Sequence, residues 1–222
     1  MKVAALYDIH GNLPALEAVL AEIDADVILV GGDTVAGPWP SETLERLRSL
    51  DADVRFIRGN ADREVYEERQ GLAPPEVMEF VRGHLSPEQL EFLRSLPLTV
   101  SIGPVLFCHA TPRNDEEIFT AISPEERWRE ALAGVDADVV VCGHTHVQFD
   151  RRIGDMRLVN AGSVGMPYEH EPGAYWALLD GSDVELRRTE CQAPDASQWP
   201  GEWPEASPEE ATEFFEKLSR GE

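Results

Sequence analysis

Cysteines are few in this sequence, and none of them has the spacing of a metal site or a disulfide framework. There are three, Cys108, Cys142 and Cys191, with no C-x-x-C pair. An odd number without such a pair argues against a disulfide scaffold and a cysteine-ligated zinc. Hydrophobic runs are also short, because none reaches the roughly 18 to 20 apolar residues of a membrane span. With no signal-peptide cleavage pattern at the start, we expect a cytoplasmic protein that does not associate with membranes.

Basic residues are scarce as well. Lys and Arg together number 19 against 42 Asp and Glu, so the formal net charge is −23. Affinity for nucleic acid comes largely from Lys and Arg that neutralise phosphates, so sequence-specific nucleic-acid binding is disfavoured. A small phosphorylated substrate stays compatible with this charge, because bound metal ions reverse the local potential.

The 222 residues suit one domain with a short appendage. We expect a domain over residues 1–190, followed by a Pro- and Trp-rich linker and a C-terminal helix over 191–222. Phe214, Phe215 and Leu218 lie on one side of that helix. Such an apolar face must be buried, either on its own domain or in a homo-oligomer.

Apolar periodicity predicts a parallel βαβαβ unit in the first 60 residues. Strands are expected at 3–7, 27–30 and 54–57, with one helix over 13–23 and another capped by Ser41. Residues 62–96 read as a helical excursion in which Ser86 caps a helix. Strands then dominate, and a helix capped by Ser123 interrupts them; they are expected at 99–102, 105–108, 139–142, 148–153, 157–159, 175–179 and 184–188. This order suggests two packed sheets with helices outside.

Polar side chains follow these strands at the end where parallel α/β sheets bind ligands. They are, in chain order, Asp8, His10, Asp33, Asn60, His109, His144 and His146. Residues two apart on an extended chain point the same way, so Asp8 with His10, and His144 with His146, are each expected to face one point. Imidazole, carboxylate and amide oxygen suit divalent transition metals. Seven groups are too many for one ion and indicate two, about 3.5 to 4 Å apart and bridged by a shared carboxylate.

The ordered motifs Asp8-x-His10, Gly32-Asp33, Gly59-Asn60, His109 and Gly143-His144-x-His146 resemble the calcineurin-like metallophosphoesterase superfamily. The similarity is strongest to its small bacterial and archaeal phosphodiesterase-like members, and Asn160-Ala161-Gly162-Ser163 resembles a turn found in them. The resemblance implies a four-layer αββα sandwich of two mixed sheets flanked by helices.

The resemblance also implies a ligand set. Asp8, His10 and His146 would hold one metal, Asn60, His109 and His144 the other, and Asp33 would bridge them. The ions are expected to be Mn²⁺, with Fe, Co, Ni, Zn and Mg as alternatives. The implied enzyme is a hydrolase that cleaves phosphodiester or phosphoanhydride bonds with a hydroxide activated by both metals.

One position departs from the family pattern. Many members carry a histidine directly after the Gly-Asn pair, and here that residue is Ala61. A methyl group cannot protonate a leaving oxygen, so we expect a preference for leaving groups that need little protonation.

The sequence leaves the roles of several neighbouring residues open. Asn12 and Arg63 are candidate substrate ligands besides Asn60, although Asn12 equally suits a helix cap and Arg63 a solvated helix start. Asp62 either orients a metal ligand or caps a helix. Met166 and Tyr168 read as packing residues.

The sequence leaves two alternative functions open. A dinucleoside-polyphosphate hydrolase of the Ap4A type would need a stacking surface, for which Trp39 is a candidate. A non-catalytic scaffold with this fold, like the retromer scaffold subunit, would be expected to lack metal ligands.

Overall fold

The computed structural model describes residues 1–67, 71–192, 195, 197–203 and 205–222. The strands, in chain order, are β1 (Lys2–Leu6), β2 (Val27–Val30), β3 (Asp53–Phe56), β4 (Thr99–Ile102), β5 (Val105–Cys108), β6 (Val139–Cys142), β7 (Phe149–Ile153), β8 (Met156–Asn160), β9 (Ala174–Asp180) and β10 (Asp183–Thr189). The helices are α1 (Leu13–Glu22), α2 (Pro40–Arg48), α3 (Asn60–Glu67), α4 (Pro75–His84), α5 (Pro87–Ser95), α6 (Glu125–Ala131) and α7 (Pro208–Ser219).

The strands form two five-stranded mixed sheets. The first has the order β10-β9-β1-β2-β3, in which β1, β2 and β3 are parallel and β9 and β10 are antiparallel to their neighbours. The second has the order β4-β5-β6-β8-β7, with β5, β6 and β8 parallel at its centre. Strands β1, β2, β5 and β6 are almost continuously apolar, as expected for strands buried on two faces.

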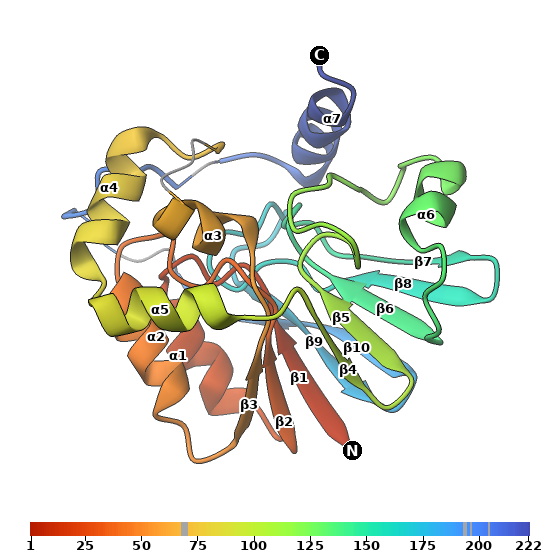
Figure 1. The fold of residues 1–222 in the computed structure, drawn as a ribbon, viewed down its shortest axis with the longest axis horizontal. Coiled ribbons are helices and arrows are strands. Elements are labelled where there is room, and N and C mark those ends of the chain that lie inside the picture. The colour runs from red at the N-terminus through yellow and green to blue at the C-terminus, as the bar shows by residue number, and fades with distance from the viewer. Residues whose placement is uncertain (68–70, 193–194, 196, 204) are drawn as a thin grey trace.

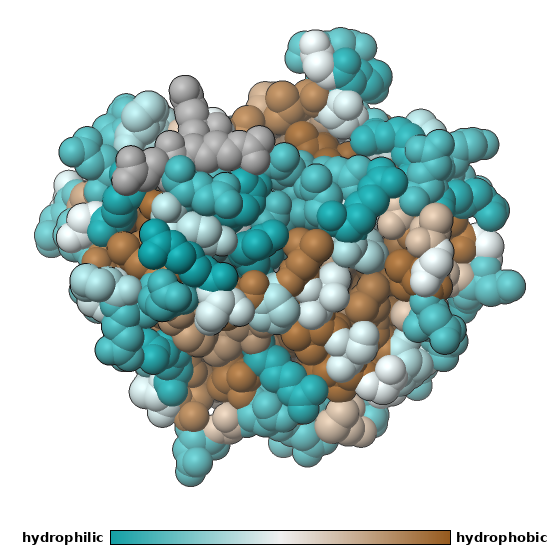
Figure 2. All heavy atoms as spheres, viewed as in Figure 1, coloured by the Kyte–Doolittle hydropathy of each residue, from teal (hydrophilic) through white to brown (hydrophobic). Residues whose placement is uncertain are grey.

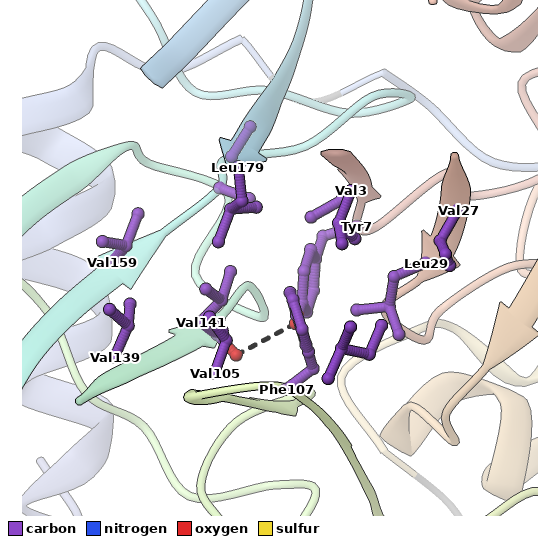
Figure 3. Packing of buried hydrophobic residues seen from close by; sticks show 14 of the residues in the cluster. Val3, Tyr7, Val27, Leu29, Val105, Phe107, Val139, Val141, Val159 and Leu179 are labelled. Atoms are coloured by element: carbon purple, nitrogen blue, oxygen red, sulfur yellow. Dashed lines mark hydrogen bonds between the residues drawn. The ribbon is translucent and has the colours of Figure 1, made fainter. Parts of the chain in front are cut away.

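The main hydrophobic core lies between the two sheets (Figure 3). Val3 and Leu29 of the first sheet face Phe107 and Val141 of the second. Tyr7, at the end of β1, donates its hydroxyl to the carbonyl of Val141 at 2.9 Å. This buried hydrogen bond ties the two sheets together close to the ends from which the polar residues emerge.

Helices cover the outer faces, so the expected αββα sandwich is confirmed. Leu16 and Val19 of α1 pack on the first sheet, and the fully buried Trp128 of α6 packs on the second. Helices α2 to α5 share a further apolar cluster beyond β3, with Leu44, Val65, Val81 and Leu93 among its buried members.

Three local expectations differ from the structure. Helix α3 begins at Asn60, two residues before the start of the helical stretch expected over 62–96. Ser41 lies in the first turn of α2, whose N-cap is Trp39. Ser123 lies one residue before the N-cap Pro124 of α6 and hydrogen-bonds elsewhere. In the last two cases a proline, Pro40 or Pro124, sets the helix start in place of a side-chain cap.

The surface is mostly hydrophilic, in line with the net charge, and hydrophobic atoms gather at the foot of α7 (Figure 2). Within the described parts of the chain, no helix is both long and apolar enough to cross a membrane.

Candidate metal centre

The polar residues predicted from the strand ends meet at one place. Asp8 and His10 follow β1, Asp33 follows β2, and Asn60 opens α3 after β3. His109 follows β5 of the second sheet, and His144 and His146 follow β6. All these side chains except Asn60 are buried, with Asp8 and His109 completely so.

Backbone strain is concentrated in this set. Among the described residues, the non-glycine positions with positive φ are Asp8 (51°), His10 (47°), Asp33 (51°), His144 (69°) and His146 (57°). The left-handed region costs an L-residue about 1–2 kcal/mol, and such strain clusters at functional sites. Asp8 and His10 therefore converge on one candidate site through left-handed turns, as expected, although the backbone is not extended. His144 and His146 were expected to face one point, but the left-handed turns direct them to different candidate sites, so that expectation is wrong.

Asp8, His10 and His146 form one candidate metal site, with ligand atoms all within 4.8 Å of one another. The carboxylate Oδ1 of Asp8 lies 3.3 Å from Nε2 of His146 and 3.9 Å from Nε2 of His10.

Asp33, His109 and His144 form a second candidate site by the same measure. Oδ2 of Asp33 lies 3.5 Å from Nε2 of His109 and also 3.8 Å from Nε2 of His10 in the first site. Oδ1 of Asn60 lies 3.1 Å from Nε2 of His109, where an amide oxygen adds a donor. Asp33 therefore stands between the two groups.

Two buried polar atoms indicate that metal ions fit here. Oδ1 of Asp8 and Nε2 of His144 are buried without a hydrogen-bond partner among the described residues. Leaving such groups unsatisfied costs about 1–3 kcal/mol each, and more for a charged group. A cation at each candidate site would satisfy the ligand atom there, and the donor set of imidazole, carboxylate and amide oxygen suits a divalent transition metal.

The histidine rings are held in the orientation that a metal requires. The carbonyls of Ala36, Gly31 and Met166 hydrogen-bond to Nδ1 of His10, His109 and His146, at 3.2, 2.9 and 2.7 Å respectively. With the proton on Nδ1, each Nε2 carries a lone pair that faces the site.

The ionisable side chains of the site shift one another's pKa values. Burial alone would lower the pKa of His109, but the Asp33 carboxylate outweighs it and raises that pKa to about 10. Burial and the neighbouring His109 lower the pKa of His144 to about 4. The protein thus gathers several ionisable groups in a buried space, where a divalent cation compensates the carboxylates.

The loops approach so closely that glycine is required at two positions. A Cβ on Gly59 would lie 2.1 Å from Oδ1 of Asp33, and one on Gly143 would lie 2.3 Å from Oδ2 of Asp8. These glycines belong to the Gly-Asn and Gly-His motifs, and their role is to let the strand-end loops touch the carboxylates.

A second layer of hydrogen bonds fixes these loops. Asp62 accepts from the backbone N–H groups of Thr34, Val35 and Gly59, so it ties the loop after Asp33 to the loop before α3. The structure therefore supports the orienting role for Asp62. Burial, and then the charge of Asp33, raise the pKa of Asp62 to about 7.

The turn that follows β8 clamps both metal-motif loops. The side-chain amide of Asn160 donates to the carbonyl of Gly143, and the hydroxyl of Ser163 donates to the carbonyl of Asp8. This gives a structural reason for the Asn160-Ala161-Gly162-Ser163 motif.

Two expected substrate contacts lie elsewhere. Asn12 caps α1 by accepting from the N–H of Ala15, and its amide donates to the carbonyl of Gly165. Arg63 is buried and forms ion pairs with Asp115, Glu67 and Glu116. The expectation that either residue contacts the substrate is therefore corrected. Asn12 caps a helix, as the alternative had it, and Arg63 is neither a free phosphate ligand nor exposed to solvent.

A cavity of about 500 Å³ opens beside the metal residues. The side chains of His10, Asp33, Asn60, His144 and His146 form its floor. Its walls include residues that sequence reasoning had assigned to packing or to the linker, namely Met166, Tyr168, Trp199 and Phe215. The density of tryptophan in the tail was the available signal for Trp199. Trp39, the candidate stacking platform, occupies the N-cap position of α2 and lies outside the described lining of this cavity.

The cysteines near the site are not nucleophiles. Cys108 and Cys142 are buried, and burial raises the pKa of both thiols well above its usual value. They pack in the cluster beneath α6, as expected.

Comparisons with known proteins agree with this geometry. Residues 1–183 match the model of the calcineurin-like phosphoesterase superfamily domain. Phosphodiesterase YfcE of Escherichia coli is 27% identical over 190 residues, which cover 80% of this chain and 87% of that protein. A crystal structure of a metallophosphoesterase from Sphaerobacter thermophilus superposes with a TM-score of 0.74 and 27% identity over 86% of this chain and 89% of that one.

A further relative matches only in part. The symmetrical bis(5′-nucleosyl)-tetraphosphatase of Pectobacterium atrosepticum is 35% identical over 71 residues, 30% of this chain and 25% of that protein. The family model, by contrast, spans β1 to β9 and every predicted metal ligand. The chain therefore belongs to the calcineurin-like phosphoesterase superfamily, a family of metal-dependent hydrolytic phosphoesterases.

Proposed function

We propose that this protein is a phosphodiesterase that works with two divalent metal ions, most readily Mn²⁺. The observation that carries the proposal is the pair of buried His-His-Asp groups joined through Asp33, with unpartnered ligand atoms on Asp8 and His144. Asp8, His10 and His146 would hold one ion, and Asn60, His109 and His144 the other.

Bound metal ions would supply a water of lowered pKa and neutralise charge on the phosphate. The chain's own residues do the positioning. The backbone N–H of Ala61 donates to Oδ1 of Asp33 at 2.8 Å, which leaves Oδ2 turned to His109. The N–H of His144 donates to Oδ2 of Asp8 at 2.8 Å, which leaves Oδ1 facing His146. Each carboxylate is thus anchored through one oxygen and presents the other.

The residue at position 61 is alanine, which cannot donate a proton to the leaving oxygen. Ala61 lies on the wall of the cavity next to the metal residues. Phosphodiesters of acidic alcohols need little protonation on departure, and the same holds for phosphoanhydrides. Simple alkyl monoesters are expected to be poor substrates.

The alternatives receive less support. The similarity to the tetraphosphatase is confined to about a third of this chain. A scaffold role is disfavoured because all seven predicted ligand positions meet at one place with ligating side chains. The expectations of a cytoplasmic location, a small phosphorylated substrate and a homo-oligomer remain part of the proposal.

Hydrolysis of bis(p-nitrophenyl) phosphate by metal-stripped protein, with and without Mn²⁺, tests the proposal. We expect turnover only with metal, and a loss of at least about 100-fold in His144→Ala, since even residues behind the ligands cost 10- to 100-fold. His84→Ala is the matched control, because His84 is exposed on α4. Turnover without metal, or an equal loss in both variants, would refute the proposal.

A further inference from the structure

The cavity beside the metal residues has walls from parts of the chain that are far apart in sequence. One wall comes from the residues before and within α4, another from the turn at Met166 and Tyr168, and a third from the tail. Figure 1 shows α4 and α7 on the edge of the molecule towards which β1 runs. The tail residues Trp199, Pro200, Gly201 and Glu202 contribute together with Phe215 of α7.

The tail wall is fixed to the domain. Glu216 of α7 is buried and accepts hydrogen bonds from the hydroxyls of Thr120, at 2.6 Å, and Ser123. Phe215, one residue earlier, meets Tyr168 edge-on with ring centroids 6.2 Å apart. Tyr168 in turn stacks on His146 at 5.3 Å. An aromatic series therefore connects a metal-site histidine with the tail helix.

The wall is apolar and aromatic. Tyr168, Trp199 and Phe215 line it together with Leu72 and Val77. Trp199 is only 8% exposed, and its indole N–H has no acceptor among the described residues. A cavity of this size with an aromatic lining and a few polar groups is typical of a site for a flat organic group.

The charges of the lining are negative. Glu76 and Glu202 are exposed at the cavity, and its described lining residues include no Lys or Arg. Metal ions would neutralise the phosphate that they bind, but further phosphates would lie beside carboxylates without a counter-charge. A substrate with a single negative charge is favoured over a polyphosphate chain.

On the basis of the proposed function, we propose that Trp199 and Phe215 determine specificity for phosphodiesters in which the ester group that stays on phosphorus is an uncharged aromatic ring. The ring lies against the tail wall while the phosphate lies at the metal residues. The other ester group is the one that leaves, and an acidic alcohol such as a phenol suits a site with Ala61 in place of an acid.

Two esters with the same leaving group test the inference. Bis(p-nitrophenyl) phosphate and methyl p-nitrophenyl phosphate both release p-nitrophenol and differ in the remaining group. The ratio of their kcat/KM values is expected to fall about tenfold in Trp199→Ala and in Phe215→Ala, through KM of the diaryl ester, because stacking on one aromatic side chain is worth roughly this factor or more. Trp199→Phe should keep most of the ratio.

The matched control is Phe214→Ala, whose side chain neighbours Phe215 but is 54% exposed. A far-UV circular dichroism spectrum like that of the wild type and a cooperative thermal transition in Trp199→Ala show that the variant is folded. If both esters are hydrolysed and the ratio is the same in all variants, this inference is wrong and the proposed function stands.

A binding measurement tests the role of Trp199 independently of turnover. Calorimetry with Mn²⁺-loaded protein is expected to show about tenfold tighter binding of the methyl monoester of phenylphosphonate than of methylphosphonate, and the difference should vanish in Trp199→Ala. Equal affinities in the wild type would overturn the inference. So would a kcat/KM for diadenosine tetraphosphate that matches that of the diaryl ester.

Discussion

At the scale of single residues, the site depends on side chains held in unusual backbone conformations. The residues Asp8, His10, Asp33, His144 and His146 all adopt positive φ. Strand endings and residue types were enough to predict that these side chains gather at one place, because the carboxyl ends of parallel strands share one edge. Their role as metal ligands stays a prediction. The left-handed turns were not predictable, since they arise from contacts between loops, such as that of Gly143 with Asp8.

Ala61 offers a direct test of the missing acid. We expect Ala61→His to raise kcat/KM for an alkyl phosphodiester by at least about tenfold, since general acid catalysis contributes 10² to 10⁴ where it operates fully. The p-nitrophenyl diester should change little, because its leaving group needs no proton. Rates across esters of increasing leaving-group pKa measure this. An equal change for all esters would contradict the assigned role of position 61.

At the scale of elements, most helices and strands were predictable from the sequence. The start of α3 and the role of the tail were not. Strand β2 is confirmed at residues 27–30, and Ser86 with Pro87 opens α5 as expected. Helix α3 begins at Asn60, two residues before the helical stretch expected from residue 62, and burial of Val65 in the α2 to α5 cluster stabilises it. The boundary at residue 190 stays a prediction. The tail was expected to be a linker, and only tertiary contacts reveal that it lines the cavity.

The docking of α7 is testable through Glu216. Glu216→Ala leaves the buried hydroxyls of Thr120 and Ser123 without their acceptor, at a cost of about 1.5–3 kcal/mol for hydrogen bonds to a charged group. We expect amide hydrogen exchange in α7 to accelerate at least about tenfold. Glu213→Ala is the control, because Glu213 is exposed and pairs only with Lys217 in the described structure. Equal protection of α7 in both variants would show that Glu216 does not hold the helix.

The ion pairs of α3 predict a pH-dependent stability. Burial would raise the pKa of Asp115, but its pairs with Arg63 and Arg58 outweigh burial and lower it. A lowered folded pKa stabilises the native state above the unfolded pKa of about 4, and this contribution is lost as the pH falls through the folded value. Asp115→Asn should lose about 2 kcal/mol of unfolding free energy at pH 7.

The difference between wild type and Asp115→Asn should shrink as the pH is lowered below about 4, measured by urea denaturation. Asp53→Asn is the control, since Asp53 pairs with Arg55 at the surface, and little change is expected. A difference that is independent of pH would contradict the ion-pair explanation.

At the scale of the whole molecule, the charge of −23 works against compactness. Salt screens this repulsion, with a Debye length that falls from about 30 Å at 0.01 M to about 3 Å at 1 M. We expect Tm to rise by about 2–4 °C over this range in metal-free protein, which corresponds to about 1 kcal/mol for a chain of this size. A fall in Tm would mean that surface ion pairs outweigh the net repulsion.

Each candidate metal site draws ligands from the ends of strands in both sheets. Turnover of bis(p-nitrophenyl) phosphate, followed as Mn²⁺ is added to metal-stripped protein and plotted against bound metal per chain, tests this claim most directly. We predict negligible turnover up to one bound ion and full activity at two. Full activity at one bound ion, or none at two, would contradict the account.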